Sequence, residues 1–120
     1  MPDANSSVPM QAFIGGTWCE AGNGARFAVH DPATGARIGD VADCGAAEAG
    51  AAIDAAEAAQ FGWAATPAAE RGAILRRWRD LMVERADALA AVLTRENGKP
   101  LAEARGEILY GASYLEWFAD

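Results

Sequence analysis

The residue types best suited to catalysis or metal binding in this chain are one histidine, His30, and two cysteines, Cys19 and Cys44. His30 lies beside an Asp-Pro turn and has no second histidine or cysteine at the spacing of a metal site. The cysteines show no CxxC spacing and no disulfide-dense pattern, which is typical of two independent thiols in a reducing compartment. Cys44 precedes a predicted helix whose N-terminus could lower the pKa of the thiol. We nevertheless interpret both thiols as unreactive and His30 as a turn or surface residue.

Glycine-rich loops that bind phosphate are the next candidates. Gly15, Gly16, Gly22 and Gly24 do not complete a GxGxxG pattern between a strand and a helix, and no GxxxxGK[ST] loop occurs in the sequence. The acidic residues are scattered over predicted helix faces, where they are usually solvated. The motifs therefore assign no catalytic residue and no cofactor-binding residue.

The net charge of the chain indicates which classes of partner it can bind. The chain has 120 residues with 10 basic and 17 acidic side chains, which gives a formal charge of −7. This charge repels phosphate backbones and anionic lipids, so we expect neither a nucleic-acid partner nor a membrane partner. The one basic run, Arg76, Arg77 and Arg79, is interpreted as a solvated helix face. Since the first residues lack a signal-peptide pattern and no long apolar run follows, we predict a cytoplasmic protein.

The first part of the chain predicts a disordered tail followed by β-hairpins. Residues 1–9 are polar with little to bury. Short β-friendly runs at 13–14, 17–19, 27–30 and 37–41 alternate with glycine-rich turns, which predicts two hairpins. In the second hairpin Pro32 presets φ, Gly35 accepts a positive φ, and the Asp31 carboxylate can bond the turn backbone.

From Ala46 the hydrophobic period changes to that of a helix. The predicted inward face of the first helix consists of Ala49, Ile53, Ala56 and Ala59 or Gln60, and Gly62 is expected to break the pattern. The next helix is expected to begin with Thr66 as N-cap and Pro67 at its first position. Its predicted core stripe is Ile74, Trp78, Leu81 and Met82, which continues after a bend near Arg85 with Leu89, Val92 and Leu93.

An Asn-Gly-Lys-Pro corner separates the last two helices. Gly98 suits the left-handed position that ends a helix, and Pro100 can open the next one. The predicted inner stripe of the last helix is Leu101, Ala104, Ile108, Ala112, Leu115 and Ala119. Because Tyr110, Tyr114, Trp117 and Phe118 lie beside or off this stripe, we expect that more than one side of the helix must be covered.

Four stretches together resemble the opening segment of an aldehyde dehydrogenase. They are FIGGTW, HDPATGARIGDV, the helices from AAIDAAEAAQ to ILRRWRDLM, and TRENGKPLAEARGEILYGASYLEWFAD. Within that superfamily, GKPLAEA, GEI and EWFA resemble the succinate-semialdehyde dehydrogenases. The resemblance implies an α/β fold, with β-hairpins followed by three to four helices, in which residues 10–120 form the incomplete N-terminal part of the cofactor-binding domain.

The implied full-length enzyme uses NAD or NADP to oxidise succinate semialdehyde to succinate in 4-aminobutyrate degradation and is expected to be a homo-oligomer. In relatives a cysteine thiolate, an oxyanion-binding asparagine and a glutamate base perform the reaction. The motifs that carry these residues are not found in residues 1–120. The chain alone is therefore expected to be inactive.

Only weak candidates for site residues carry over from the family. Gly106 and Tyr110 match helix positions that line the substrate entrance in relatives, although Tyr110 could equally be a core aromatic. Main-chain oxygens at Val29 and His30 and the carboxylate of Glu96 match a monovalent cation site. Relatives usually carry an aspartate at that acid, so Glu96 departs from their pattern.

Two alternatives remain open from the sequence. The chain could be a stand-alone helical interaction module that binds a partner through its exposed helix face. It could also be the N-terminal part of an aldehyde dehydrogenase with another substrate.

Overall fold

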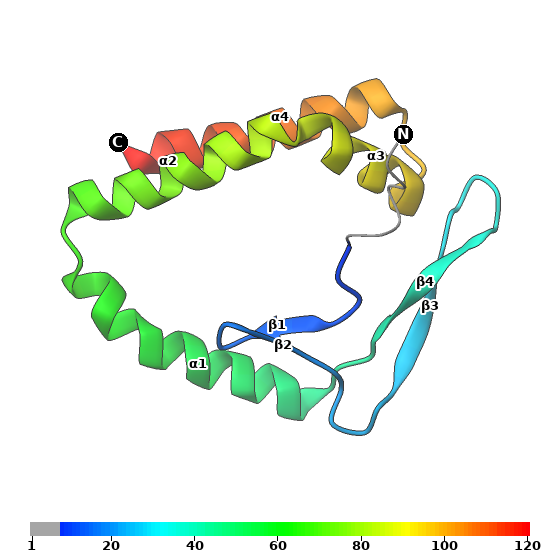
Figure 1. The fold of residues 1–120 in the computed structure, drawn as a ribbon, viewed down its shortest axis with the longest axis horizontal. Helices are drawn as coiled ribbons and strands as arrows, with labels where there is room; N and C mark the ends of the chain where they lie inside the picture. Colours follow the sequence, from blue (N-terminus) through cyan, green and yellow to red (C-terminus); the bar gives the residue numbers. More distant parts are fainter. Residues whose placement is uncertain (1–7) are drawn as a thin grey trace. The chain divides into compact units, whose positions relative to one another are not determined.

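The computed structural model describes residues 8–120, which form four strands followed by four helices in the predicted order (Figure 1). The strands are β1 (Ala12–Ile14), β2 (Thr17–Cys19), β3 (Arg26–His30) and β4 (Arg37–Ala42), and the helices are α1 (Ala46–Ala65), α2 (Ala68–Glu84), α3 (Ala86–Asn97) and α4 (Leu101–Ala119). Residues 8 and 9 of the predicted tail lie outside any regular element, and residues 1–7 lie outside the described residues. None of the helices in residues 8–120 is long and apolar enough to cross a membrane.

The chain divides into two compact units. The first, here called the hairpin unit, contains β1 to β4 and α1 and comprises the chain up to His30 together with Gly35–Ala65. The second, here called the helical unit, contains α2, α3 and α4 and comprises Asp31–Thr34 and Thr66–Asp120.

Two antiparallel hairpins form the strands of the hairpin unit, as predicted. β1 pairs with β2 around a Gly15-Gly16 turn, and both glycines have positive φ, 59° and 84°, as a tight hairpin turn requires. β3 pairs with β4 up to Val29 opposite Gly39, after which His30 pairs with Arg37 and the register shifts. The shift is a β-bulge, which bends the hairpin just before the Asp-Pro turn.

The predicted Asp-Pro turn is confirmed. The Asp31 carboxylate accepts the backbone N–H of Ala33 at 2.8 Å and of Thr34 at 3.3 Å. Gly35 has φ of 74°, a left-handed conformation that favours glycine. Local turn chemistry therefore fixes the direction in which the chain returns.

The N-terminus of α1 is closed by one half of a capping box, which was not predicted from the sequence. The Gly45 carbonyl accepts the Ala49 N–H at 3.1 Å, and the Gly45 N–H donates to the Glu48 carboxylate at 2.7 Å. The other carboxylate oxygen of Glu48 accepts the N–H of Gly22 at 2.8 Å. One side chain thus connects the start of α1 to the loop between β2 and β3.

Two predictions about α1 are wrong. The helix continues through Gly62, because a single glycine costs a helix only about 1 kcal/mol and does not by itself end it. The half-buried positions include Glu48, Ala52 and Ala55, whereas Ile53 of the predicted face is 66% exposed. The Gly15 turn approaches the Ala55 methyl group, so the small side of the helix meets the β1–β2 hairpin.

The helical unit is built around α2 and α4, which run side by side in opposite directions (Figure 1). The bend predicted near Arg85 is confirmed, since α2 ends at Glu84 and α3 begins at Ala86. Gly98 ends α3 with φ of 81°, also as predicted. The predicted helix starts differ by one residue, because Pro67 and Pro100 occupy the N-cap positions of α2 and α4.

Small residues form the contact between α2 and α4. Gly72 is buried, and a Cβ placed on it would lie 2.4 Å from the carbonyl oxygen of Ala119. Ala104, Ala112 and Ala119 of the predicted α4 stripe are buried, as expected. The backbones of the two helices therefore come close together at the C-terminal end of α4.

The predicted stripe of α2 is only partly confirmed. Leu81 and Met82 are half-buried, but Ile74 and Trp78 are more than half exposed. Leu101, the first residue of the predicted α4 stripe, is exposed as well. The prediction failed in part because it placed Ile74 and Trp78 inward, whereas α2 approaches α4 most closely at Gly72, where there is no room for a side chain.

Arg76 and Arg79 also correct the interpretation of the basic run as a solvated face. Arg76 donates to the carbonyl oxygen of Ala119 at 3.0 Å and to the Asp120 carboxylate at 2.8 Å. Arg79 pairs with Glu116 at 2.6 Å. These arginines bind the last turn of α4, where helix carbonyls lack partners within the helix.

Candidate functional site

The exposed face of α4 carries the predicted substrate-entrance residues Gly106 and Tyr110. They lie one turn apart, and Tyr114 follows one turn later on the same side. A Cβ placed on Gly106 would meet no atom within 4 Å, so the helix surface is open at that point. Tyr110 is 64% exposed in this chain, and both its entrance role and the alternative of a core aromatic remain predictions.

Tyr110 and Tyr114 form a pair that the sequence reading did not identify. Their hydroxyl oxygens are 2.6 Å apart, and their rings meet edge to face with centroids 5.1 Å apart. The hydrogen bond with Tyr110, followed by partial desolvation, raises the pKa of Tyr114. Tyr114 therefore keeps its proton near neutral pH. The i, i+4 spacing of two tyrosines was the sequence signal for the pair.

A shallow apolar groove of about 390 Å³ lies next to this pair. Its lining is Ser113, Tyr114, Trp117 and Phe118, and the Ser113 hydroxyl is bonded to the Tyr110 carbonyl at 2.7 Å. Trp117 and Phe118 are 78% and 73% exposed. The expectation that α4 is apolar on more than one side is thus confirmed, and this face can contact an apolar compound or an apolar protein surface.

The residues of the predicted cation site lie in different units. Val29 and His30 are in β3 of the hairpin unit, and Glu96 is an exposed residue near the end of α3 in the helical unit. Among residues 8–120 there is no group of three histidine, cysteine, aspartate or glutamate side chains that could hold a metal ion. That observation does not address a site made mostly of main-chain oxygens, so the cation site remains a prediction.

The surroundings of Cys44 and Cys19 are consistent with the interpretation that both thiols are unreactive. Partial desolvation and then the Glu48 carboxylate raise the pKa of Cys44, which is opposite to the direction expected for a thiol activated by a helix N-terminus. The hydrogen bonds from Gly22 and Gly45 hold the pKa of Glu48 below its ordinary value, so a carboxylate already occupies the positive end of α1. Cys19 is half-buried and bonded to the Ala12 carbonyl at 3.5 Å.

Comparison with known proteins gives a consistent result. Residues 18–120 match the aldehyde dehydrogenase family. A glutarate-semialdehyde dehydrogenase of Pseudomonas aeruginosa is 54% identical over 110 residues, which cover 92% of this chain and 23% of the relative. An NADP(+)-dependent succinate-semialdehyde dehydrogenase of Escherichia coli is 53% identical over 110 residues, with the same two coverages, 92% and 23%.

Solved structures agree with the sequence matches. The crystal structure of a succinate-semialdehyde dehydrogenase from Burkholderia pseudomallei superposes with a TM-score of 0.92 at 54% identity, covering 99% of this chain and 24% of that one. This chain therefore spans about a quarter of the length of the relatives that it matches. Two hairpins followed by four helices correspond to an N-terminal segment of that fold, and the chain belongs to the aldehyde dehydrogenase family.

Proposed function

We propose that this chain is the N-terminal scaffold segment of an NAD(P)-dependent dehydrogenase that oxidises succinate semialdehyde to succinate in 4-aminobutyrate degradation. The observation that supports the proposal best is the identity of 54% and 53%, over 110 residues each, to two semialdehyde dehydrogenases. The names of these relatives specify substrates that carry a carboxylate at the end opposite to the aldehyde. The proposal extends this substrate class to the present chain.

The role of the segment in such an enzyme is to support other parts of the protein. Residues 10–120 would belong to the cofactor-binding domain. The exposed aromatic face of α4, formed by Tyr110, Tyr114, Trp117 and Phe118, would pack against the rest of the enzyme. Burying one large apolar side chain stabilises a protein by about 1.5–3 kcal/mol, so four such residues are a substantial contribution to assembly. Homo-oligomerisation and a cytoplasmic location are part of the same proposal.

The cofactor would supply hydride acceptance, with NAD and NADP both included in the proposal. Residues 8–120 do not form a glycine-rich phosphate-binding loop between a strand and a helix. We therefore assign no step of hydride transfer to the residues of this chain. Their proposed contribution is the shape of the substrate entrance.

At the entrance, Tyr110 would narrow the path to the reacting centre and Gly106 would keep it open. A side chain added at Gly106 would extend from an open helix surface one turn from the Tyr110 ring. The Tyr114 hydroxyl would restrain the Tyr110 ring through their hydrogen bond. The Tyr114 hydroxyl, whose pKa is raised, would offer no negative charge to repel the substrate carboxylate.

A segment-exchange experiment tests the proposal. The matched 110 residues of the E. coli enzyme are replaced by those of this chain, and reduced cofactor is measured at 340 nm with succinate semialdehyde, glutarate semialdehyde and acetaldehyde. We expect kcat/KM for succinate semialdehyde within about tenfold of the parent enzyme, because the reacting groups are unchanged. The 120-residue chain alone is expected to show no turnover.

A second exchange, with the corresponding segment of the Burkholderia enzyme, controls for mismatched packing. If that enzyme is active and the one with the present segment is folded but at least a hundredfold less active, the proposal is wrong. If the isolated chain instead unfolds cooperatively as a monomer with the α4 aromatic face protected, the interaction-module alternative replaces it.

The entrance role is tested in the exchanged enzyme by Gly106→Leu. We expect kcat/KM for succinate semialdehyde to fall by at least about tenfold, because a misplaced group near the substrate path can cost that much. Gly50→Leu in α1 is the matched control, since a Cβ at Gly50 also meets no atom within 4 Å. Equal activities of the two variants would contradict an entrance role for Gly106.

A further inference from the structure

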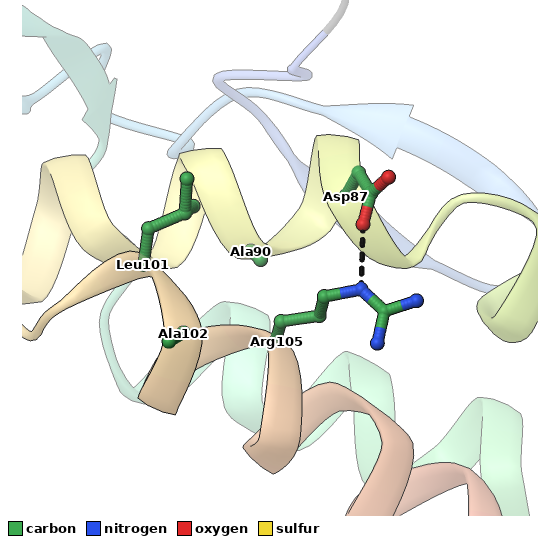
Figure 2. Close-up of a pocket in the computed structure, with 5 residues that line it drawn as sticks. All are labelled: Asp87, Ala90, Leu101, Ala102 and Arg105. Atoms are coloured by element: carbon green, nitrogen blue, oxygen red, sulfur yellow. Dashed lines mark hydrogen bonds and ion pairs between the residues drawn. The ribbon is translucent and has the colours of Figure 1, made fainter.

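A second pocket lies on a face of the helical unit formed by α3 and α4 (Figure 2). It has a volume of about 410 Å³ and is lined by Asp87, Ala90, Leu101, Ala102 and Arg105. Ala90 is fully buried, and Ala90 and Ala102 contribute only methyl groups, so space remains between the two helices. The volume falls within the range of small-molecule sites.

The charged side of this pocket is an ion pair between Arg105 and Asp87, in which only one nitrogen of the guanidinium contacts the carboxylate. The Nε of Arg105 donates to the Asp87 carboxylate at 2.7 Å. Among residues 8–120 the contact of Arg105 with Asp87 is made by Nε alone, and Figure 2 shows the two Nη groups directed away from the Asp87 carboxylate. A guanidinium has five N–H donors, and its paired Nη groups match the two oxygens of a carboxylate.

We propose that this pocket binds an aliphatic monocarboxylate. The carboxylate would accept hydrogen bonds from both Nη groups of Arg105, and the hydrocarbon chain would cover the exposed side chains of Leu101 and Ala102. The choice of ligand follows from charge complementarity, because Arg105 is the only cationic side chain in the lining. Asp87 would repel a second negative charge, so a monoanion fits better than a dicarboxylate or a phosphate.

The apolar groove on the C-terminal half of α4 provides an internal comparison. Its volume, about 390 Å³, is similar, but its lining of Ser113, Tyr114, Trp117 and Phe118 carries no charge. An aliphatic chain could contact either surface, whereas only the α3–α4 pocket offers a guanidinium. A ligand that needs its carboxylate should therefore select the α3–α4 pocket.

The test is a titration followed by ¹H–¹⁵N NMR, with octanoate, octanol and acetate as probes. It is performed on the 120-residue chain and on the exchanged enzyme described above, the latter read by calorimetry. We expect octanoate to bind at least tenfold more tightly than octanol or acetate and to shift the amide signals of residues 87–105. Equal binding of octanol, or shifts confined to residues 113–118, would overturn the proposal.

Three variants locate the site. Arg105→Gln should weaken octanoate binding at least tenfold by removing the charge, and Ala102→Leu should do so by filling the pocket. Asp87→Asn is the matched control, since it leaves the guanidinium in place and should bind octanoate as tightly as the parent chain or more tightly.

Unchanged affinity in both Arg105→Gln and Ala102→Leu would overturn the proposal, as would the lack of octanoate binding to both proteins. The inference rests on the α3–α4 surface alone. Its failure would therefore leave the proposed dehydrogenase function unaffected. Failure of the proposed dehydrogenase function would likewise leave the carboxylate site unaffected.

Discussion

In the helical unit, α2 approaches α4 most closely where Gly72 meets the backbone of Ala119, whereas in the hairpin unit the loop after β2 is joined to α1 through the carboxylate of Glu48. The first contact depends on the absence of side chains and the second on one charged group. Of the six buried apolar residues in the described part of the chain, all alanines, only Ala21 lies in the hairpin unit. The two units should therefore respond differently to substitution and to pH.

The largest expected effect is that of Gly72→Ala. The added methyl group would meet the Ala119 carbonyl at 2.4 Å, so one helix must move, at a cost of about 2–3 kcal/mol of unfolding free energy. Urea denaturation followed by far-ultraviolet circular dichroism measures this loss. Gly106→Ala is the control and should gain about 0.5–1 kcal/mol from helix propensity, because its methyl group meets open space. Equal effects of the two variants would contradict the proposed close contact.

Gly98→Ala should have the next largest effect. Gly98 has φ of 81°, and an added Cβ would lie 2.8 Å from Cγ of Pro32. We expect a loss of about 1–2 kcal/mol from backbone strain and crowding at the corner before α4. Gly62→Ala in α1 is the matched control, since Gly62 is helical with open space around it, and should be stabilising. If Gly98→Ala left the free energy of unfolding unchanged, the corner before α4 would have to be free to rearrange.

Arg76→Gln should cost less, about 0.5–1 kcal/mol, because Arg76 is only half-buried, Asp120 is exposed, and such a pair contributes little. Part of the effect comes from the Ala119 carbonyl, which would lose its arginine donor. Raising the salt concentration should therefore reduce the effect without abolishing it. The measurement is the same urea denaturation at low and high salt, with Arg77→Gln as the control. A loss as large in Arg77→Gln would show that net charge, and not the contact with α4, is responsible.

Glu48→Gln tests the hairpin unit through pH, with the smallest expected effect. The backbone hydrogen bonds of Gly22 and Gly45 hold the pKa of Glu48 in the folded chain below its ordinary value of about 4.5. Its contribution to stability is therefore complete above that value and is lost as the pH falls through the lower, folded pKa. At pH 7 the parent chain should have a higher melting temperature than the variant, and this difference in melting temperature should shrink under acidic conditions. A difference that stays constant down to pH 2 would contradict this account, and Glu57→Gln on the same helix is the control.

The turns and corners could be predicted from the sequence because glycine and proline act locally. Asp31, Gly35 and Gly98 adopt the conformations that their residue types predict, and Arg85 marks the bend. The inward faces of α1 and α2 were harder to predict. The prediction placed large apolar side chains inward, whereas Ala52 and Ala55 of α1 and Gly72 of α2 are the residues that face inward. The role of Glu48 depends on its contact with Gly22, which lies 26 positions away in the sequence.

In the candidate site, too, features set by neighbouring residues could be predicted, and features set by contacts between helices could not. The positions of Gly106 and Tyr110 on one exposed face follow from helical spacing, and so does their alignment with Tyr114. The pocket between α3 and α4 could not be predicted, because it depends on how Ala90 meets Ala102 and Arg105 across two helices. The carboxylate binding proposed there rests on that tertiary contact.

The exposure of all four tryptophans has a practical consequence. Trp18, Trp63, Trp78 and Trp117 each have at least 39% of their surface accessible. Their indole rings should emit at wavelengths close to those of the unfolded chain, so intrinsic fluorescence would change little when this chain unfolds by itself. A pronounced blue shift should instead accompany the covering of these rings by another protein surface, which makes the emission spectrum a reporter of assembly.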